Sequence, residues 1–173
     1  TACEAVDGTA AVVRWLSHGV SPDTVDQKWP LLACASSKGR LETVDLLLAV
    51  GADVDAVKTD TGATSLYLAA QDGHVAVIEK LIVACADVDK ARTITGVTPL
   101  FIAAQNGHTS TVEKLIAAGA DVNKARTTDN STPLLIAAGR GHTSTVEKLI
   151  AASADVDKAL TTDGTTPLYM AAQ

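Results

Sequence analysis

A block of about 34 residues recurs along the chain, and this period limits strongly what the chain can fold into. The clearest copy is TPLFIAAQNGHTSTVEKLIAAGADVN at 98–123, which returns at 132–157 with few changes and at 64–89 in a looser form. The glycines that mark the spacing are Gly39, Gly73, Gly107 and Gly141. Periods of this length are typical of stacked two-helix repeats. The sequence therefore predicts a repeat protein.

The first half of each copy has the features of a short helix. In the clearest copy a Thr-Pro pair, Thr98-Pro99, predicts its start, because the threonine hydroxyl can cap free N–H groups and proline suits the first helical position. Leu100, Ala103 and Ala104 then fall on one apolar stripe whose small residues allow close helix packing. We expect the glycine that follows to end this helix.

The second half of each copy predicts another helix. Ser110 and Glu113 match the S-x-x-E capping box, and Val112, Leu115 and Ile116 form a second apolar stripe. A glycine after this stripe can adopt the left-handed conformation that ends a helix. Because neither helix can bury its stripe alone, successive copies are expected to stack on one another.

The pattern T-P-L-x-x-A-A-x-x-G-H, followed by V-x-x-L-I/L-x-x-G-A-D-V-N/D, is similar to the ankyrin repeat consensus over nearly the whole chain. The resemblance implies an all-α repeat solenoid of antiparallel helix pairs with β-hairpin-like fingers. It also implies that fingers and first helices line a concave side on which partners bind. The histidines of the Gly-His pairs, His74, His108 and His142, are expected to bond backbone near the finger.

The chain departs from the consensus in its fingers and at some helix ends. Its period is one residue longer than usual, and the extra residue falls in the finger. Cys85 and Ser153 stand where the other copies have a helix-ending glycine. If the left-handed conformation is kept there, each substitution should cost about 1 kcal/mol.

We predict a single ankyrin-repeat domain over residues 1–173, with five repeats and a C-terminal half-repeat. The degenerate first repeat is placed at 1–25, with its first helix at 2–6, and the partial sixth repeat at 162–173. The four repeats between them are placed at about 26–59, 60–93, 94–127 and 128–161.

Composition narrows the class of function. Hydrophobic residues make up 47% of the chain but aromatic residues only 3%, which favours close helix packing over a large ligand cavity. The net charge of −6 argues against nucleic acid as a partner, since phosphate binding depends on Lys and Arg. No apolar run approaches the roughly 18 residues of a membrane span.

The cysteines and histidines give no reason to expect a metal or a cofactor. Three cysteines without short spacings predict neither a disulfide framework nor a zinc site, and Cys34 is placed as a small core residue. This usage favours an intracellular protein, cytoplasmic or nuclear. Histidines one repeat apart should lie about 8–10 Å from one another, too far to share a zinc ion at about 2.1 Å. No catalytic motif is present, and we predict that the chain is not an enzyme.

The best recognition signal lies where otherwise similar copies differ. In the fingers a basic row, Lys58, Arg92 and Arg126, either is neutralised between neighbouring fingers or meets an acidic segment of a partner. On the first helices, aromatic residues replace the consensus histidine and either bind a partner or pack under the fingers. The predicted partner-binding residues are Lys58, Tyr67, Gln71, Asp72, Arg92, Phe101, Gln105, Asn106, Arg126, Leu135, Arg140 and Tyr169.

A modification site is a further hypothesis. Leu115 followed by Asp121, Val122 and Asn123 is similar to the ankyrin pattern used by asparaginyl hydroxylase, with Asn123 as acceptor. Other copies carry aspartate in its place, so drift is the alternative interpretation.

These observations predict a non-catalytic, monomeric adaptor or scaffold that binds another protein on its concave face. Two alternatives remain open. The repeats are either the regulatory arm of a larger enzyme, or an engineered or orphan stack without a natural partner.

Overall fold

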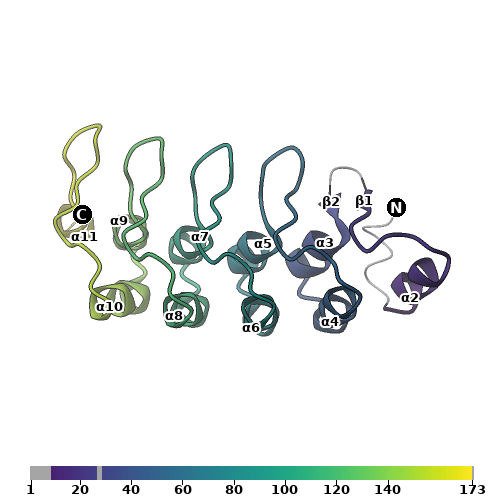
Figure 1. Cartoon of the computed structure of the whole chain (residues 1–173). Coiled ribbons are helices and arrows are strands. Elements are labelled where there is room, and N and C mark those ends of the chain that lie inside the picture. Colours follow the sequence, from purple (N-terminus) through teal and green to yellow (C-terminus); the bar gives the residue numbers. More distant parts are fainter. Residues whose placement is uncertain (1–8, 27–28, 173) are drawn as a thin grey trace. The chain divides into compact units, whose positions relative to one another are not determined.

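The computed structural model describes residues 9–26 and 29–172, which are largely helical and fall into two compact units, Thr1–Asp87 and Val88–Gln173 (Figure 1). The elements of the first unit are α2 (Thr9–Ser17), β1 (Val25–Asp26), β2 (Trp29–Pro30), α3 (Leu31–Ser37), α4 (Leu41–Ala49), α5 (Ser65–Asp72) and α6 (Val75–Val83). Those of the second unit are α7 (Pro99–Gln105), α8 (Thr109–Ala117), α9 (Pro133–Gly139), α10 (Thr143–Ala151) and α11 (Pro167–Ala171). The first helix expected at 2–6 lies outside the described residues.

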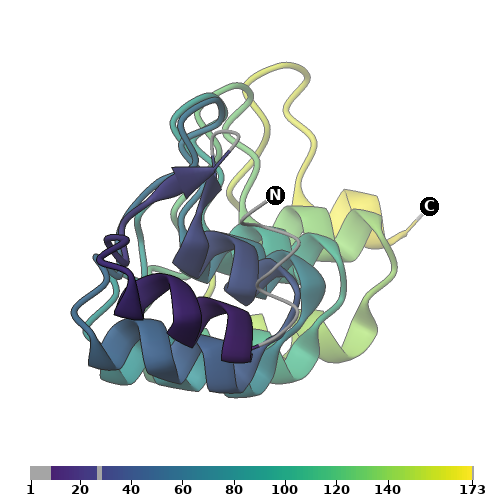
Figure 2. The ribbon, with the colours of Figure 1, turned by 90° about the vertical axis from the view of Figure 1, so that its right-hand side faces the viewer.

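Helices stack in two layers within each unit. In the first unit α3 packs on α5 and α4 on α6, while α2 contacts α4. In the second unit α9 packs between α7 and α11, and α8 packs on α10. Figure 2 shows that in each unit the first helices lie between the second helices and the projecting loops. The fold class predicted from the repeat, an all-α repeat stack, is confirmed; the number of repeats stays a prediction.

The first helices begin as the sequence predicts. The Oγ1 atoms of Thr98 and Thr132 accept hydrogen bonds from the N–H groups three residues later, at 3.1 and 3.2 Å. Thr64 and Thr166 cap α5 and α11 in the same way. Pro99 follows as the first helical residue. Leu100, with 0% of its surface exposed, shows that the apolar stripe faces the interior.

The second helices begin earlier than the sequence predicts. The N-cap of α8 is His108, which makes no side-chain capping bond, and Ser110 lies exposed within the first turn. The predicted capping box is therefore wrong. The reason is the sharp turn at Gly107, whose carbonyl accepts the N–H of Thr109 at 2.9 Å. The helix therefore begins at Thr109, directly after this turn.

The second helices end in the left-handed conformation whether or not a glycine is present. The φ angles are 89° at Gly119, 63° at Cys85 and 65° at Ser153. The two side-chain-bearing residues therefore adopt a conformation that L-residues avoid, and the expected energetic cost applies to both.

The fingers are closed by their own backbone. The N–H of Arg92 donates to the carbonyl of Val97 at 2.9 Å, and the N–H of Gly96 returns to the carbonyl of Arg92 at 2.8 Å. The same two bonds close the loops that start at Lys58, Arg126 and Leu160. β1 and β2 pair in antiparallel fashion, with Val25 opposite Pro30, and an isolated bridge joins Val57 to Thr64. The extra residue is therefore accommodated in a hairpin-like turn.

One cysteine prediction is wrong. Cys34 is buried as expected, with 1% of its surface exposed, but it is disulfide-bonded, whereas Cys85 is exposed and free. Spacing along the sequence could not reveal this bond, because it depends on which segments the fold brings together.

Candidate functional site

The basic side chains of the fingers leave the backbone at equivalent points, yet their environments differ. Lys58 Nζ lies 3.3 Å from Oδ1 of Asp60 in the same finger and 4.3 Å from the centre of the Trp29 ring. Both contacts hold the ammonium group against the first unit. Trp29 therefore supports Lys58 at this position.

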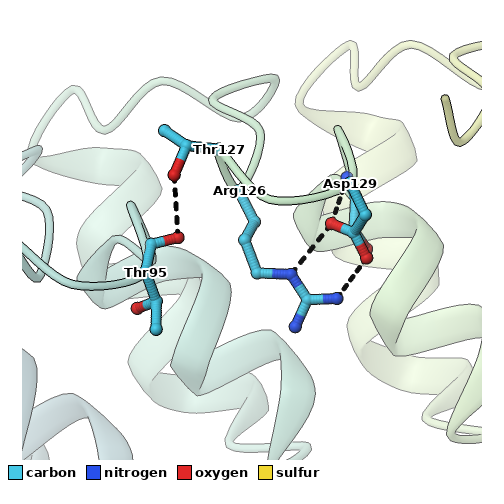
Figure 3. A network of polar contacts seen from close by, with 5 residues as sticks. Thr95, Arg126, Thr127 and Asp129 are labelled. Carbon is cyan, nitrogen blue, oxygen red and sulfur yellow. Dashed lines mark hydrogen bonds and ion pairs between the residues drawn. The ribbon is translucent and has the colours of Figure 1, made fainter.

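Arg126 is held still more firmly within its own finger (Figure 3). Its Nε donates to Oδ1 of Asp129 at 2.9 Å, a second guanidinium nitrogen donates to Oδ2, and the guanidinium carbon lies 5.4 Å from the centre of the Phe101 ring. The hydrogen bond to Arg126 lowers the pKa of Asp129 below its usual value, and the same bond raises the pKa of Arg126. A bidentate pair of this kind fixes both side chains.

These contacts correct the predicted neutralisation between neighbouring fingers. For Lys58 and Arg126 the neutralising carboxylate comes from the same finger, two or three residues later. Successive copies are instead joined by lysine bonds to backbone: Lys124 Nζ donates to the carbonyl of Asp89 at 3.0 Å, and Lys158 Nζ to that of Asn123 at 3.1 Å.

Arg92 differs from both of its counterparts. The residues two and three places later are Ile94 and Thr95, so its own finger supplies no carboxylate. Its Nε atom is buried and has no hydrogen-bond partner, and the hydroxyl of Thr95 is in the same state. Thr95 does accept a bond through its carbonyl, from the Thr127 hydroxyl at 3.2 Å (Figure 3).

Asn123 lies in a row of side chains that join one copy to the next. Its Oδ1 accepts the N–H of Asp155 at 2.8 Å, just as Asp89 accepts the N–H of Asp121 and Asp55 that of Asp87. This shared role explains why asparagine and aspartate interchange here. Hydroxylation of Asn123 stays a prediction.

The residues that replace the consensus histidine are mostly internal. Tyr67, Phe101 and Leu135 expose 4%, 0% and 2% of their surface, so these three have no surface to offer a partner. The structure thus shows the packing alternative for them. Tyr169, at 58% exposed, is the exception among the four.

Other predicted residues do reach the surface at the ends of the first helices. Asp72 is exposed at the end of α5, and Asn106 and Arg140 are exposed at the ends of α7 and α9. Gln71 and Gln105 are half-buried. The exposed polar ends and the finger tips therefore form the candidate surface of each unit.

The histidines have a structural role, at a place other than the one implied. His142 Nε2 lies 3.0 Å from the carbonyl oxygen of Gln105, and His74 Nε2 lies 3.1 Å from that of Ser37. Both carbonyl partners are the last residues of a first helix in the preceding copy, so each bond joins the start of a second helix to the end of that first helix, and not to a finger. In the part of the chain that the structure describes, no group of three His, Cys, Asp or Glu side chains is placed to hold a metal ion.

An apolar groove of about 230 Å³ lies at α9, α10 and α11. Its lining consists of Leu134, Ala138, Val146, Ile150, Val156, Pro167 and Leu168. One period earlier, Leu134 stands in the place of Leu168; Leu134 is 2% exposed, whereas Leu168 is 78% exposed.

Reasoning from the sequence did not pair the finger carboxylates Asp60 and Asp129 with the basic residue of the same finger. The signal was present in the spacing, since each acid follows its basic partner by two or three residues. Ile94 stands at a finger position that differs between copies, and 62% of its surface is exposed.

Comparison with known families fits this arrangement. A family model described as ankyrin repeats, with three copies, matches residues 1–94, 31–126 and 100–173. The chain belongs to the ankyrin repeat family. Ankyrin repeats are generally protein–protein interaction modules. A search of curated proteins finds no significant match for this chain. Within the described residues of this ankyrin-repeat protein, every helix is too short or too polar to cross a bilayer.

Proposed function

We propose that this chain is a non-catalytic protein-binding module that uses its finger tips and first-helix ends as the working surface. In the family these elements line the concave face. The observation that carries the proposal is the distribution of differences between copies. Ile94, Thr128 and Thr162 occupy one finger position, and all three are exposed. Asn106 and Arg140 likewise differ and are exposed, whereas the capping threonines Thr98 and Thr132 repeat and are buried.

The mechanism is presentation of a preformed surface. The finger backbone is closed by its own hydrogen bonds, and the helix ends are fixed by packing, so little conformational entropy is lost on binding. A few well-placed side chains can then set affinity. This role suits an adaptor or scaffold, and we expect the isolated chain to be a monomer.

The compartment remains a proposal. An intracellular location was expected from the cysteine pattern, but the Cys34 disulfide counts against a reducing compartment. Partner capture should therefore use both cell lysate and secreted material.

The test is affinity capture followed by mass spectrometry, with the chain beside N106A/R140A. Both residues are exposed at first-helix ends, and the variant should lose the partner at least tenfold. Its melting temperature is measured beside that of the wild type, to show that the variant is folded under the capture conditions. The matched control is S144A/E147Q, which changes two exposed residues of α10 on the second-helix layer. Equal recovery with N106A/R140A would place binding elsewhere. Loss with the control alone would point to the second helices.

A further inference from the structure

The four equivalent finger positions offer an internal comparison of charge. Lys58, Arg92, Arg126 and Leu160 each donate their N–H to the carbonyl five residues later, so their side chains leave equivalent backbone frames. Acids follow at Asp60, Asp129 and Asp163, within three residues of positions 58, 126 and 160. The finger at 92–97 is the one whose corresponding residues are uncharged.

Arg92 is therefore a guanidinium without the carboxylate that its neighbour Arg126 has. Its Nε and the Thr95 hydroxyl are both buried without a hydrogen-bond partner. The residue as a whole is only half-buried, so part of the side chain reaches the surface. A buried donor that lacks an acceptor gains more from an incoming acceptor than a donor already satisfied. The finger at 92–97 thus lacks a hydrogen-bond acceptor for its arginine, whereas the finger of Arg126 supplies one.

We propose that the finger at 92–97 docks an acidic side chain of a partner protein, with Arg92 as the carboxylate anchor. This inference rests on the proposed function and deepens it by naming the chemistry recognised. The guanidinium fork matches a carboxylate in two parallel bonds, as the Arg126–Asp129 pair demonstrates in the same unit. Docking turns the Arg92 side chain to the orientation that Arg126 already adopts, which brings Nε to the incoming oxygen.

The same finger also favours a particular kind of residue beside the acidic residue of the partner. Ile94, two residues after Arg92 in the same finger, is 62% exposed and offers apolar contact area. The segment that fits is therefore a Glu or Asp followed by an apolar residue. The chain carries a net charge of −6, so an acidic segment gains no long-range attraction and recognition depends on contact at Arg92.

The experiment uses the full chain labelled with ¹⁵N and follows the Nε–H resonances of its arginines. The probe is N-acetyl-Glu-Leu-amide, and the matched control probe is N-acetyl-Gln-Leu-amide, which has the same shape without the charge. The acidic probe should shift the Arg92 resonance in a saturable way, with an affinity at least tenfold higher than that of the control. The Arg126 resonance should not move, because Asp129 already occupies its fork.

Two reciprocal variants sharpen the test. Thr95→Asp places a carboxylate where the Arg126 finger has Asp129, so it should weaken probe binding at least tenfold while Arg92 remains present. Asp129→Thr should release Arg126 and make its resonance respond to the probe. Arg92→Gln removes the guanidinium itself and should also weaken probe binding. It replaces either of the other variants if that variant does not give the spectrum of a folded protein.

The outcomes separate this inference from the proposed function. An Arg92 resonance that ignores the acidic probe, or that responds equally to both probes, would overturn the anchor. If partner capture still succeeds in that case, the proposed protein-binding function is retained and only the contact between Arg92 and a carboxylate is rejected. Unchanged probe affinity in Thr95→Asp would equally reject Arg92 as the recognised group.

Discussion

A Cβ atom on Gly107 would lie 2.6 Å from Nδ1 of His142, so the imidazole of one copy fills the space beside the glycine of the copy before it. The ring is held there by its bond to the carbonyl of Gln105 at 3.0 Å. Gly39 and His74 repeat the relationship in the first unit, where the same distance is 2.7 Å. In these two cases the Gly-His pair acts across copies, because the glycine of one copy accommodates the histidine of the next.

The first prediction is that Gly107→Ala and His142→Ala are not additive. Gly107→Ala should cost at least about 1–2 kcal/mol of unfolding free energy, because φ is +71° and the new methyl meets the ring. His142→Ala should cost about 1 kcal/mol from the lost hydrogen bond. With the ring removed, the alanine should cost less. Urea unfolding of both single variants and the double variant measures the coupling, and strict additivity would contradict the packing described here.

The second prediction concerns the helix ends that lack glycine. Cys85→Gly and Ser153→Gly should each raise the free energy of unfolding by about 1 kcal/mol, since φ is 63° and 65° at these positions. Gly119→Ala is the control in the opposite direction, with φ of 89° and open space around the site. Thermal and urea unfolding measure both effects. A destabilised Ser153→Gly would mean that the serine makes a contact that compensates for its backbone.

The third prediction is an acid-sensitive contribution from Asp129. Its pKa is lowered chiefly by the hydrogen bond from Arg126, so the ionised form is stabilised by folding. The contribution is present above the ordinary aspartate pKa of about 3.9 and is lost as the pH falls through the lower folded value. Asp129→Asn should therefore be less stable than the wild type near neutral pH, by up to about 1 kcal/mol for a partly exposed pair. The difference should shrink at about pH 2.5. A constant difference across this range would contradict the assignment.

The fourth prediction tests the Cys34 disulfide. The chain has three cysteines, and Cys85 is free while Cys34 is bonded. Denatured protein purified without reductant should react with a thiol reagent at Cys85, and modification of Cys34 should require prior reduction. Mass spectrometry of the labelled peptides identifies each site. Labelling of Cys34 without reductant would show that the bond does not form in the purified protein.

The sequence predicted those features that depend on the backbone and on periodic burial. Thr98 was placed correctly as a cap, and Gly119 as a left-handed helix end, because each depends on local geometry that residue type controls. The capping role of Ser110 was predicted wrongly because the turn at Gly107 moves the helix start by a fraction of a turn.

The candidate site was harder to predict because side-chain partners depend on finger geometry. The pairing of Arg126 with Asp129 joins two residues of one turn, whose side-chain directions the sequence pattern does not specify. The buried Phe101 ring has the guanidinium carbon of Arg126 5.4 Å from its centre, a contact between a first helix and a finger. The sequence left Phe101 open between packing under the fingers and binding a partner, and Arg126 open between neutralisation by a neighbouring finger and contact with a partner.

The closed finger has a consequence for how such a surface changes over time. Main-chain atoms at Arg92, Thr95, Gly96 and Val97 hold the loop together, since the N–H of Thr95 also donates to the carbonyl of Arg92 at 3.3 Å. Residues 93 and 94 contribute no bond to that closure. Substitutions at these two positions change the surface that the finger offers to a partner and leave its backbone hydrogen bonds in place. Binding specificity can therefore change, in evolution or by engineering, through substitutions in one finger while the other fingers stay the same.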